Sequence, residues 1–139
     1  MFDVLDIGTS GLIAQRAHLD TIAGNIAMKD VTRDEQGNAV PYRRRVPLFA
    51  QGDATRAKGS RGVHVAAIVE DPAPFGLRWD PDHPDAVRSG HDQGYVRISN
   101  VDIHTEMVNA LTALRAYEAN ATVIEMAKSM AATSLRLIA

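Results

Sequence analysis

The stretch from residue 102 to residue 138, DIHTEMVNALTALRAYEANATVIEMAKSMAATSLRLI, decides the fold of this 139-residue chain. It contains neither glycine nor proline, whereas all six prolines of the chain lie between residues 41 and 84. A run this long without helix breakers, rich in Ala, Leu, Met and Glu, predicts one continuous helix. Asn100 or Asp102 is expected to cap its start by accepting hydrogen bonds from free N–H groups of the first turn.

The length of this helix has a consequence of its own. An unbroken helix of this span measures roughly 55 Å at about 1.5 Å per residue. A compact domain of this chain length has a radius of gyration of only ~14 Å. Part of the helix is therefore expected to cover a surface outside its own domain.

Apolar residues mark two adjoining stripes on this helix. Alternate steps of three and four residues, which are typical of a coiled-coil seam, select Met107, Ala110, Leu114, Tyr117, Ala121, Ile124, Lys128, Ala131, Leu135 and Ile138. A second stripe beside it holds Val108, Leu111, Val123, Met126, Ala127 and Met130. Two stripes indicate more than one neighbour, although a single helix at the centre of a small bundle has the same periodicity. Tyr117 is interpreted as a packing residue whose hydroxyl bonds at an interface.

Residues 3–27 predict a second helix. Leucine or isoleucine recurs every seven residues, and the alternate seam positions complete a heptad pattern of Leu5, Gly8, Leu12, Gln15, Leu19, Ile22 and Ile26. Gly8 and Gly11 each weaken the helix by about 1 kcal/mol relative to Ala. They either permit close approach of another helix or leave this end frayed. The expected partner is the seam of the C-terminal helix.

The middle of the chain predicts a small β-rich insert. Segments with β-branched or extended character are residues 41–49, 62–70, 75–79 and 94–98. The two prolines of the first segment confine it to a sheet edge or an arm. Residues 28–38 and 51–62 are expected to be loops. The organisation is therefore α+β: an N-terminal helix in residues 1–30, a β-rich insert with exposed loops in residues 31–100, and a long helix in residues 101–139.

Composition excludes several classes of protein. With 15 basic and 17 acidic residues and a pI near 6.2, the chain lacks the concentrated basic footprint of a nucleic-acid-binding protein. Residues 43–45 are three arginines, which we interpret as a solvated face in preference to an anion site. The absence of cysteine removes disulfides and thiol chemistry. The first residues lack the basic and apolar regions of a secretory signal peptide, so no cleaved signal is expected.

One cluster has the composition of a metal site. Asp80, Asp82, His83 and Asp85 offer oxygen and nitrogen ligands, but Asp and Pro in this spacing are also ordinary turn formers. The five histidines show no paired ligand spacing, and no nucleophile elbow, phosphate loop or dinucleotide motif is present. We therefore expect no enzyme activity, no cofactor and no small-molecule substrate. A small metal-dependent enzyme using residues 80–85 stays open as an alternative.

Both ends of the chain resemble the signatures of bacterial flagellar rod and hook proteins. Leu19–Ala27 (LDTIAGNIA) resembles the N-terminal signature, and Arg115–Asn120 (RAYEAN) with Ala127–Met130 resembles the C-terminal one. Motifs of the insert resemble one member, a component of the proximal rod: Pro41–Arg44, Val69–Phe75, Asp80–Ala86 and Gly94–Val96. Signature positions are Asn25, Ala27, Tyr42, Arg43, Glu70, Asp71, Pro74, Pro84, Arg115, Tyr117, Glu118, Asn120, Lys128 and Ser129. Met28 and Val31 depart from the family pattern.

The resemblance implies a mechanical function. Members of this family are exported unfolded through the flagellar type III apparatus without a cleaved signal peptide. Their terminal helices pair as a coiled coil, self-associate in a helical assembly and line an axial tube in the periplasm, which transmits torque and surrounds the export channel. The implied partners are other rod proteins, a rod-base adaptor and a membrane-anchored ring. The competing hypothesis is a soluble helical adaptor or export chaperone that binds one partner helix in a finite complex.

The residues expected to form the assembly seam follow from the two heptad patterns. They are Leu5, Leu12, Leu19, Ile22 and Ile26 on the first helix, and Met107, Leu114, Tyr117, Ala121, Ile124, Leu135 and Ile138 on the second.

Overall fold

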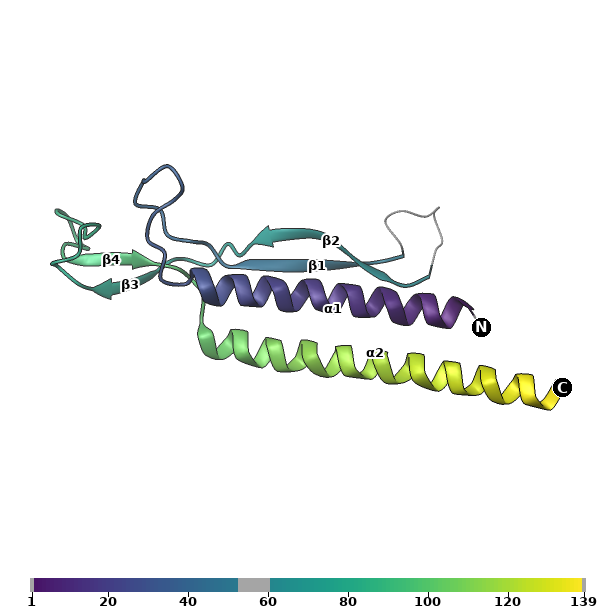
Figure 1. Ribbon diagram of the computed structural model, residues 1–139. Coiled ribbons are helices and arrows are strands. Elements are labelled where there is room, and N and C mark those ends of the chain that lie inside the picture. Colours follow the sequence, from purple (N-terminus) through teal and green to yellow (C-terminus); the bar gives the residue numbers. More distant parts are fainter. Residues whose placement is uncertain (1, 53–60, 139) are drawn as a thin grey trace.

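The computed structural model describes residues 2–52 and 61–138, with the backbone alone at residues 2, 3, 137 and 138. The elements are α1 (Phe2–Met28), β1 (Arg45–Gln51), β2 (Val63–Glu70), β3 (Gly76–Trp79), β4 (Tyr95–Ile98) and α2 (Ile103–Ile138) (Figure 1). This order confirms the predicted α+β class and each predicted helix and strand to within a few residues. The loop predicted at residues 51–62 lies mostly outside the described residues.

The two helices lie side by side and run antiparallel, with both ends of the chain at the same end of the molecule (Figure 1). Gly8 faces Ile124, Gly11 faces Asn120, and Asn25 bonds to Glu106. Later residues of α1 therefore contact earlier residues of α2, as expected for antiparallel helices. Continuing this spacing places about the last eight residues of α2, roughly 12 Å at 1.5 Å per residue, beyond the first residues of α1. This overhang has no partner helix within the described chain.

Two glycines let the helices approach closely. A Cβ added to Gly8 would lie 2.7 Å from Cγ1 of Ile124, and one added to Gly11 would lie 2.7 Å from Nδ2 of Asn120. Both distances are well inside van der Waals contact, so a larger side chain at either position would push the helices apart. Of the two roles predicted for these glycines, the structure confirms close approach.

A hairpin of β1 and β2 covers the side of α1 opposite to α2 (Figure 1). Oγ of Ser10 accepts a hydrogen bond from the Val63 N–H at 3.1 Å, and His18 meets Phe49 edge to face at 5.7 Å. Pro47 lies inside β1 and pairs with Ile68. The proline is tolerated because a two-stranded sheet consists of edge strands alone, as predicted for this segment.

A second antiparallel pair, β3 and β4, projects past the helix ends (Figure 1). Asp102 caps α2, because its Oδ1 accepts from the His104 N–H at 3.1 Å and its Oδ2 accepts from the Thr105 hydroxyl at 2.7 Å. Asn100, the other predicted cap, bonds instead to the backbone of other segments. No helix in the described ranges contains a stretch long and apolar enough to cross a bilayer.

The core within one chain is thin. Among the described residues the buried apolar side chains other than proline are Ala14, Ile22, Val96 and Ala113, and all four are small or β-branched. Most large apolar side chains are at least partly exposed. A soluble monomer rarely leaves so much apolar surface uncovered, which indicates that the missing cover comes from other molecules.

Candidate assembly surface and polar junction

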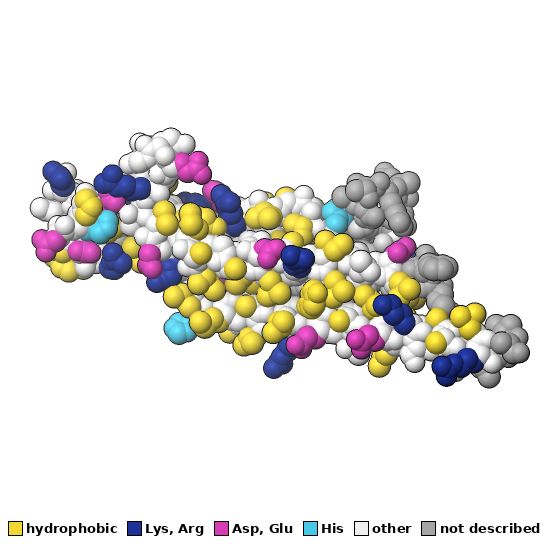
Figure 2. Space-filling model, in the orientation of Figure 1, with side chains coloured by type: hydrophobic (Ala, Val, Ile, Leu, Met, Phe, Trp, Pro, Cys, Tyr) yellow, Lys and Arg dark blue, Asp and Glu magenta, His cyan; other side chains and the backbone are white. Residues whose placement is uncertain are grey.

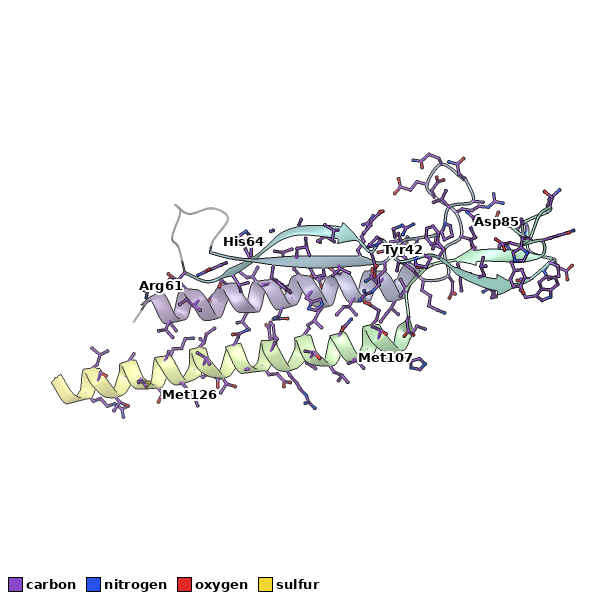
Figure 3. The ribbon with its side chains drawn as sticks, turned by 180° about the vertical axis from the view of Figure 1, so that it is seen from behind. Tyr42, Arg61, His64, Asp85, Met107 and Met126 are labelled. Atoms are coloured by element: carbon purple, nitrogen blue, oxygen red, sulfur yellow. The ribbon has the colours of Figure 1, made fainter. Side chains whose placement is uncertain are left out.

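The outer side of α2 carries the largest exposed apolar surface. Met130 is 70% exposed and Leu114 is 44% exposed. The other large exposed apolar side chains on this helix are Met107, Val108, Leu111, Tyr117, Val123, Met126 and Leu135. Figure 2 shows apolar side chains spread over the helix pair, and Figure 3 shows Met107 near the start of α2 and Met126 farther along the same helix. This surface extends over most of the helix length.

Small side chains lie on the inner side of the same helix. Ala113 is only 1% exposed, and among the described elements α2 packs against α1 and against none of the strands. Half-buried positions on α2 include Ala110, Ala116, Ala127 and Ala131. Small residues inside and large residues outside reverse the pattern of a helix that packs within one chain. The arrangement suits a helix whose main apolar contacts are with other chains.

The predicted seam is only partly turned toward α1. On α1, Ile22 is buried and the other four predicted residues are half-buried; on α2, Ala121 and Ile124 are half-buried. In contrast, the side chains of Met107, Leu114, Tyr117 and Leu135 are exposed, and the side chain of Ile138 lies outside the described residues. Within one chain these four do not close against α1. Periodicity finds apolar stripes but does not show which side of the helix meets α1. The buried side centres on Ala113 and the half-buried Ala116, which lie in neither predicted stripe. The part of the four exposed residues in assembly stays a prediction.

A buried polar junction fastens the helix pair to the insert. Asn25 is 1% exposed, and its Oδ1 accepts from the Arg45 N–H at 2.9 Å and the Tyr42 hydroxyl at 3.0 Å. Its Nδ2 donates to the Arg45 carbonyl at 2.8 Å and to Oε2 of Glu106 at 3.1 Å. One side chain thus joins α1, the start of β1 and α2. Figure 3 labels Tyr42 at this junction, where the strands reach the helix ends.

Arg44 binds two carboxylates at the junction. Its Nε lies 2.6 Å from Oε1 of Glu106, and its Nη1 lies 3.1 Å from Oδ2 of Asp71. Burial lowers the pKa of Arg44, but hydrogen bonds from its guanidinium to Glu106 and Asp71 outweigh burial and raise that pKa above its ordinary value. The pKa of Asp71 is lowered by a hydrogen bond from the Ala73 N–H and by Arg44. Oδ1 of Asn100 accepts from the Arg44 N–H at 2.8 Å.

The arginine triplet is therefore largely internal, and its interpretation as a solvated face was wrong for two of its members. Nη1 of Arg43 donates to the carbonyls of Asp71 and Ala73, both at 3.0 Å, and its guanidinium lies 4.3 Å from the ring centroid of Phe75. The guanidinium of Arg45 lies 5.6 Å from the ring of Tyr42. The carbonyl acceptors of Arg43 lie in the segment just after β2, 28 and 30 residues along the chain, so the sequence around three consecutive arginines does not reveal them.

The acidic loop at residues 80–85 serves a structural purpose. The side chain of Asp85 is only 6% exposed; its Oδ1 is 2.6 Å from Nη2 of Arg33, and its Oδ2 accepts from the Thr32 hydroxyl at 2.9 Å. The hydrogen bond from Arg33, followed by that from Thr32, lowers the pKa of Asp85. Within the described ranges no three His, Asp or Glu side chains gather to hold a metal ion. Asp85 instead ties the loop after α1 to the β3–β4 region.

The signature residues divide between the junction and the surface. Asn25, Tyr42, Arg43 and Asp71 build the junction, and Asn120 packs against Gly11. The remainder are exposed, namely Ala27, Glu70, Pro74, Pro84, Arg115, Tyr117, Glu118, Lys128 and Ser129. Sequence reasoning assigned no role in the junction to Glu106, Arg44 or Asn100. The one available signal was that Arg44 is the last residue of the motif Pro41–Arg44.

Comparison with known proteins gives a consistent result. Residues 92–137 match the family model described as flagellar basal body rod FlgEFG protein C-terminal. The chain is 39% identical to the flagellar basal-body rod protein FlgC of Borreliella burgdorferi, over 99% of this chain and 97% of that protein. It is 38% identical to FlgC of Bacillus subtilis and 37% identical to FlgC of Salmonella typhimurium, over at least 97% of both chains in each case. The chain belongs to the FlgC family of flagellar basal-body rod proteins.

Proposed function

We propose that this protein assembles with other rod proteins into the helical tube of the flagellar proximal rod, which transmits torque and surrounds the export channel. Its family is one of structural rod proteins, so the chain is a structural component of the basal-body rod and not an enzyme. The observation that carries the proposal is the long exposed apolar surface of α2, together with an overhang that has no partner helix among the described residues.

Assembly would complete the coiled-coil seam. In this proposal the helices of residues 1–30 and 101–139 form the axial part, and residues 31–100 form the outer part. Met107, Leu114, Tyr117 and Leu135 then pack against helices of neighbouring subunits, while Ile22 and Ile124 hold the pair within one chain. Contacts of this kind join different surfaces on successive subunits, and such contacts build helical assemblies when the rotation does not close.

The remaining features of the proposal follow from the same assembly. The subunit reaches the periplasm through the flagellar type III apparatus without a cleaved signal peptide. There it meets the rod-base adaptor and the membrane-anchored ring. A rod built around an export channel needs subunits that travel unfolded, and a chain with a thin core of its own suits that requirement. The adaptor alternative predicts a finite complex and is not favoured by the family match.

Leu114→Asp tests the proposed surface. Leu114 is already exposed in the single chain, so an aspartate there should leave the helix content of the isolated protein unchanged. In the rod the new charge would be buried without a partner, at a cost of about 3 kcal/mol or more. We expect loss of motility and of rod assembly, measured by swimming and by recovery of the variant in isolated basal bodies.

The matched control is Thr112→Asp, which adds the same charge at an exposed polar position on the same helix. It should retain most of its motility. Ile124→Asp is less informative because Ile124 packs against Gly8 within the chain. Wild-type swimming of the Leu114→Asp strain would contradict the proposed role of this surface.

A further inference from the structure

The β3–β4 pair presents one uncovered face. In its register Leu77 lies opposite Arg97 and Trp79 lies opposite Tyr95, so these four side chains share a face. The other face buries Val96 completely. On the uncovered face Trp79 is 61% exposed, Leu77 is 49% exposed and Tyr95 is 37% exposed. The face is thus apolar at its centre and carries a single cation, Arg97.

The aromatic pair on this face is held in place. Trp79 and Tyr95 meet edge to face with centroids 5.0 Å apart. The Trp79 ring also lies over Gly94, whose φ is +81°; a Cβ there would be 2.6 Å from the ring. Ordered Trp, Tyr and Arg side chains are the types that dominate binding energy at protein interfaces. Within the described part of the chain, the guanidinium of Arg97 has no ion-pair partner.

The outer face of α2 offers the complementary chemistry. Leu111 and Leu114 are exposed, and Glu118 follows one helical turn later on the same side. No hydrogen bond or ion pair involves the Glu118 carboxylate in the described structure. In Figure 1 the β3–β4 pair projects from one end of the molecule while α2 runs toward the other, and α2 contacts no strand of its own chain. A contact between these two surfaces therefore requires two chains.

We propose that the face formed by Leu77, Trp79, Tyr95 and Arg97 docks on α2 of a second copy of this chain. In this contact the three apolar side chains of the face pack on Leu111 and Leu114, and Arg97 forms an ion pair with Glu118. This inference deepens the proposed rod function and rests on it. Because the two surfaces differ, the contact is heterologous and leaves one free surface of each kind on every dimer. It adds subunits in an open series and orients the outer part of one subunit against the axial part of the next.

Crosslinking between two variants tests the docking, and the absence of native cysteine makes it specific. Arg97→Cys and Glu118→Cys are produced together in one strain, basal bodies are isolated, and a short bis-maleimide crosslinker is added, because the α-carbons of an Arg–Glu pair lie farther apart than the roughly 7 Å that a direct disulfide can span. We expect a crosslinked dimer from the mixed strain and none from either single variant. Arg78→Cys with Glu118→Cys is the control, because Arg78 lies on the opposite face of the same sheet and should give no dimer.

Charge reversal gives an independent readout. Arg97→Glu and Glu118→Arg should each lower incorporation into basal bodies by about tenfold, and the double reversal in one chain should restore at least half of it. If the Arg97→Cys chain enters basal bodies but crosslinks to a different protein or to nothing, the docking is overturned while the rod function stands. If the unmodified chain is missing from basal bodies, the rod function itself fails.

Discussion

Glu106 is a carboxylate with no exposed surface; its charge is paired with Arg44, and it accepts a hydrogen bond from Asn25. Removing one member of a buried ion pair leaves the other charge buried without a partner, which typically costs about 3–5 kcal/mol of stability. Arg44→Ala is therefore expected to lower the free energy of unfolding by about that amount. Chemical denaturation followed by far-ultraviolet circular dichroism measures it.

Arg88→Ala is the control for this prediction, since Arg88 is exposed and forms no ion pair in the described structure. It should change the free energy of unfolding by less than about 0.5 kcal/mol. The double variant Arg44→Met with Glu106→Met removes both charges and should recover much of the loss. Equal stability of Arg44→Ala and Arg88→Ala would show that the junction contributes nothing.

Asp85 gives the protein a predictable response to acid. The Arg33 hydrogen bond lowers the pKa of Asp85 below its ordinary value of 3.8, so the folded state favours the carboxylate. The resulting stability is fully present above the pKa of the unfolded chain and is lost as pH falls through the lower folded pKa. Asp85→Asn should therefore be less stable than wild type at pH 7, and this difference should shrink below about pH 4.

The measurement is the free energy of unfolding at several pH values between 2 and 7. Asp82→Asn serves as the control because Asp82 is exposed in the same loop and makes no ion pair in the described structure. Its pH curve should follow that of wild type. A gap between Asp85→Asn and wild type that stays constant down to pH 2 would refute the linkage.

The glycines of α1 show how one residue type acts differently along an element. Gly24 has no atom within 4 Å of an added Cβ, whereas Gly11 would place its Cβ against Asn120. Alanine has a helix propensity about 1 kcal/mol more favourable than that of glycine at both positions. Gly24→Ala should raise the free energy of unfolding by up to that amount. Gly11→Ala should gain nothing or lose stability, because Asn120 must move. Thermal unfolding of the two variants distinguishes these outcomes, and equal stabilisation by both would contradict the close helix contact.

The elements themselves were predictable from the sequence for local reasons. The breaker-free run of α2 and the alternation in β2 are signals contained within a few residues. The relation between elements was not predictable in the same way. Leu114 and Ala113 are neighbours in the sequence, and only the shape of α1 with its glycines decides which of the two is buried. The hydrogen bond from Asn25 to Glu106 joins residues 81 positions apart, and no local pattern predicts it.

At the scale of the whole molecule, exposed apolar surface and a thin core predict uneven stability. The turns of α2 after about residue 130 extend beyond α1, so they should be unprotected in the isolated chain. Hydrogen exchange should be fast there and slow near the junction. Mixing with rod partners should slow exchange in the overhang and raise the helix content seen by circular dichroism. If α2 is uniformly protected from hydrogen exchange in the isolated monomer, and partners do not change this protection, the result would favour the alternative of a soluble adaptor.

The antiparallel helix pair also fixes an order of events in time. Gly8 meets Ile124, so a chain synthesised from its N-terminus cannot close this contact until almost nine-tenths of the 139 residues have been made. During that interval α1 has no partner helix, although a helix in a protein owes most of its stability to packing of its apolar face, and the two glycines near the start of α1 weaken it further. The nascent chain consequently remains open until late. Its folding is a terminal step that depends on the last segment to appear, and not a progressive one.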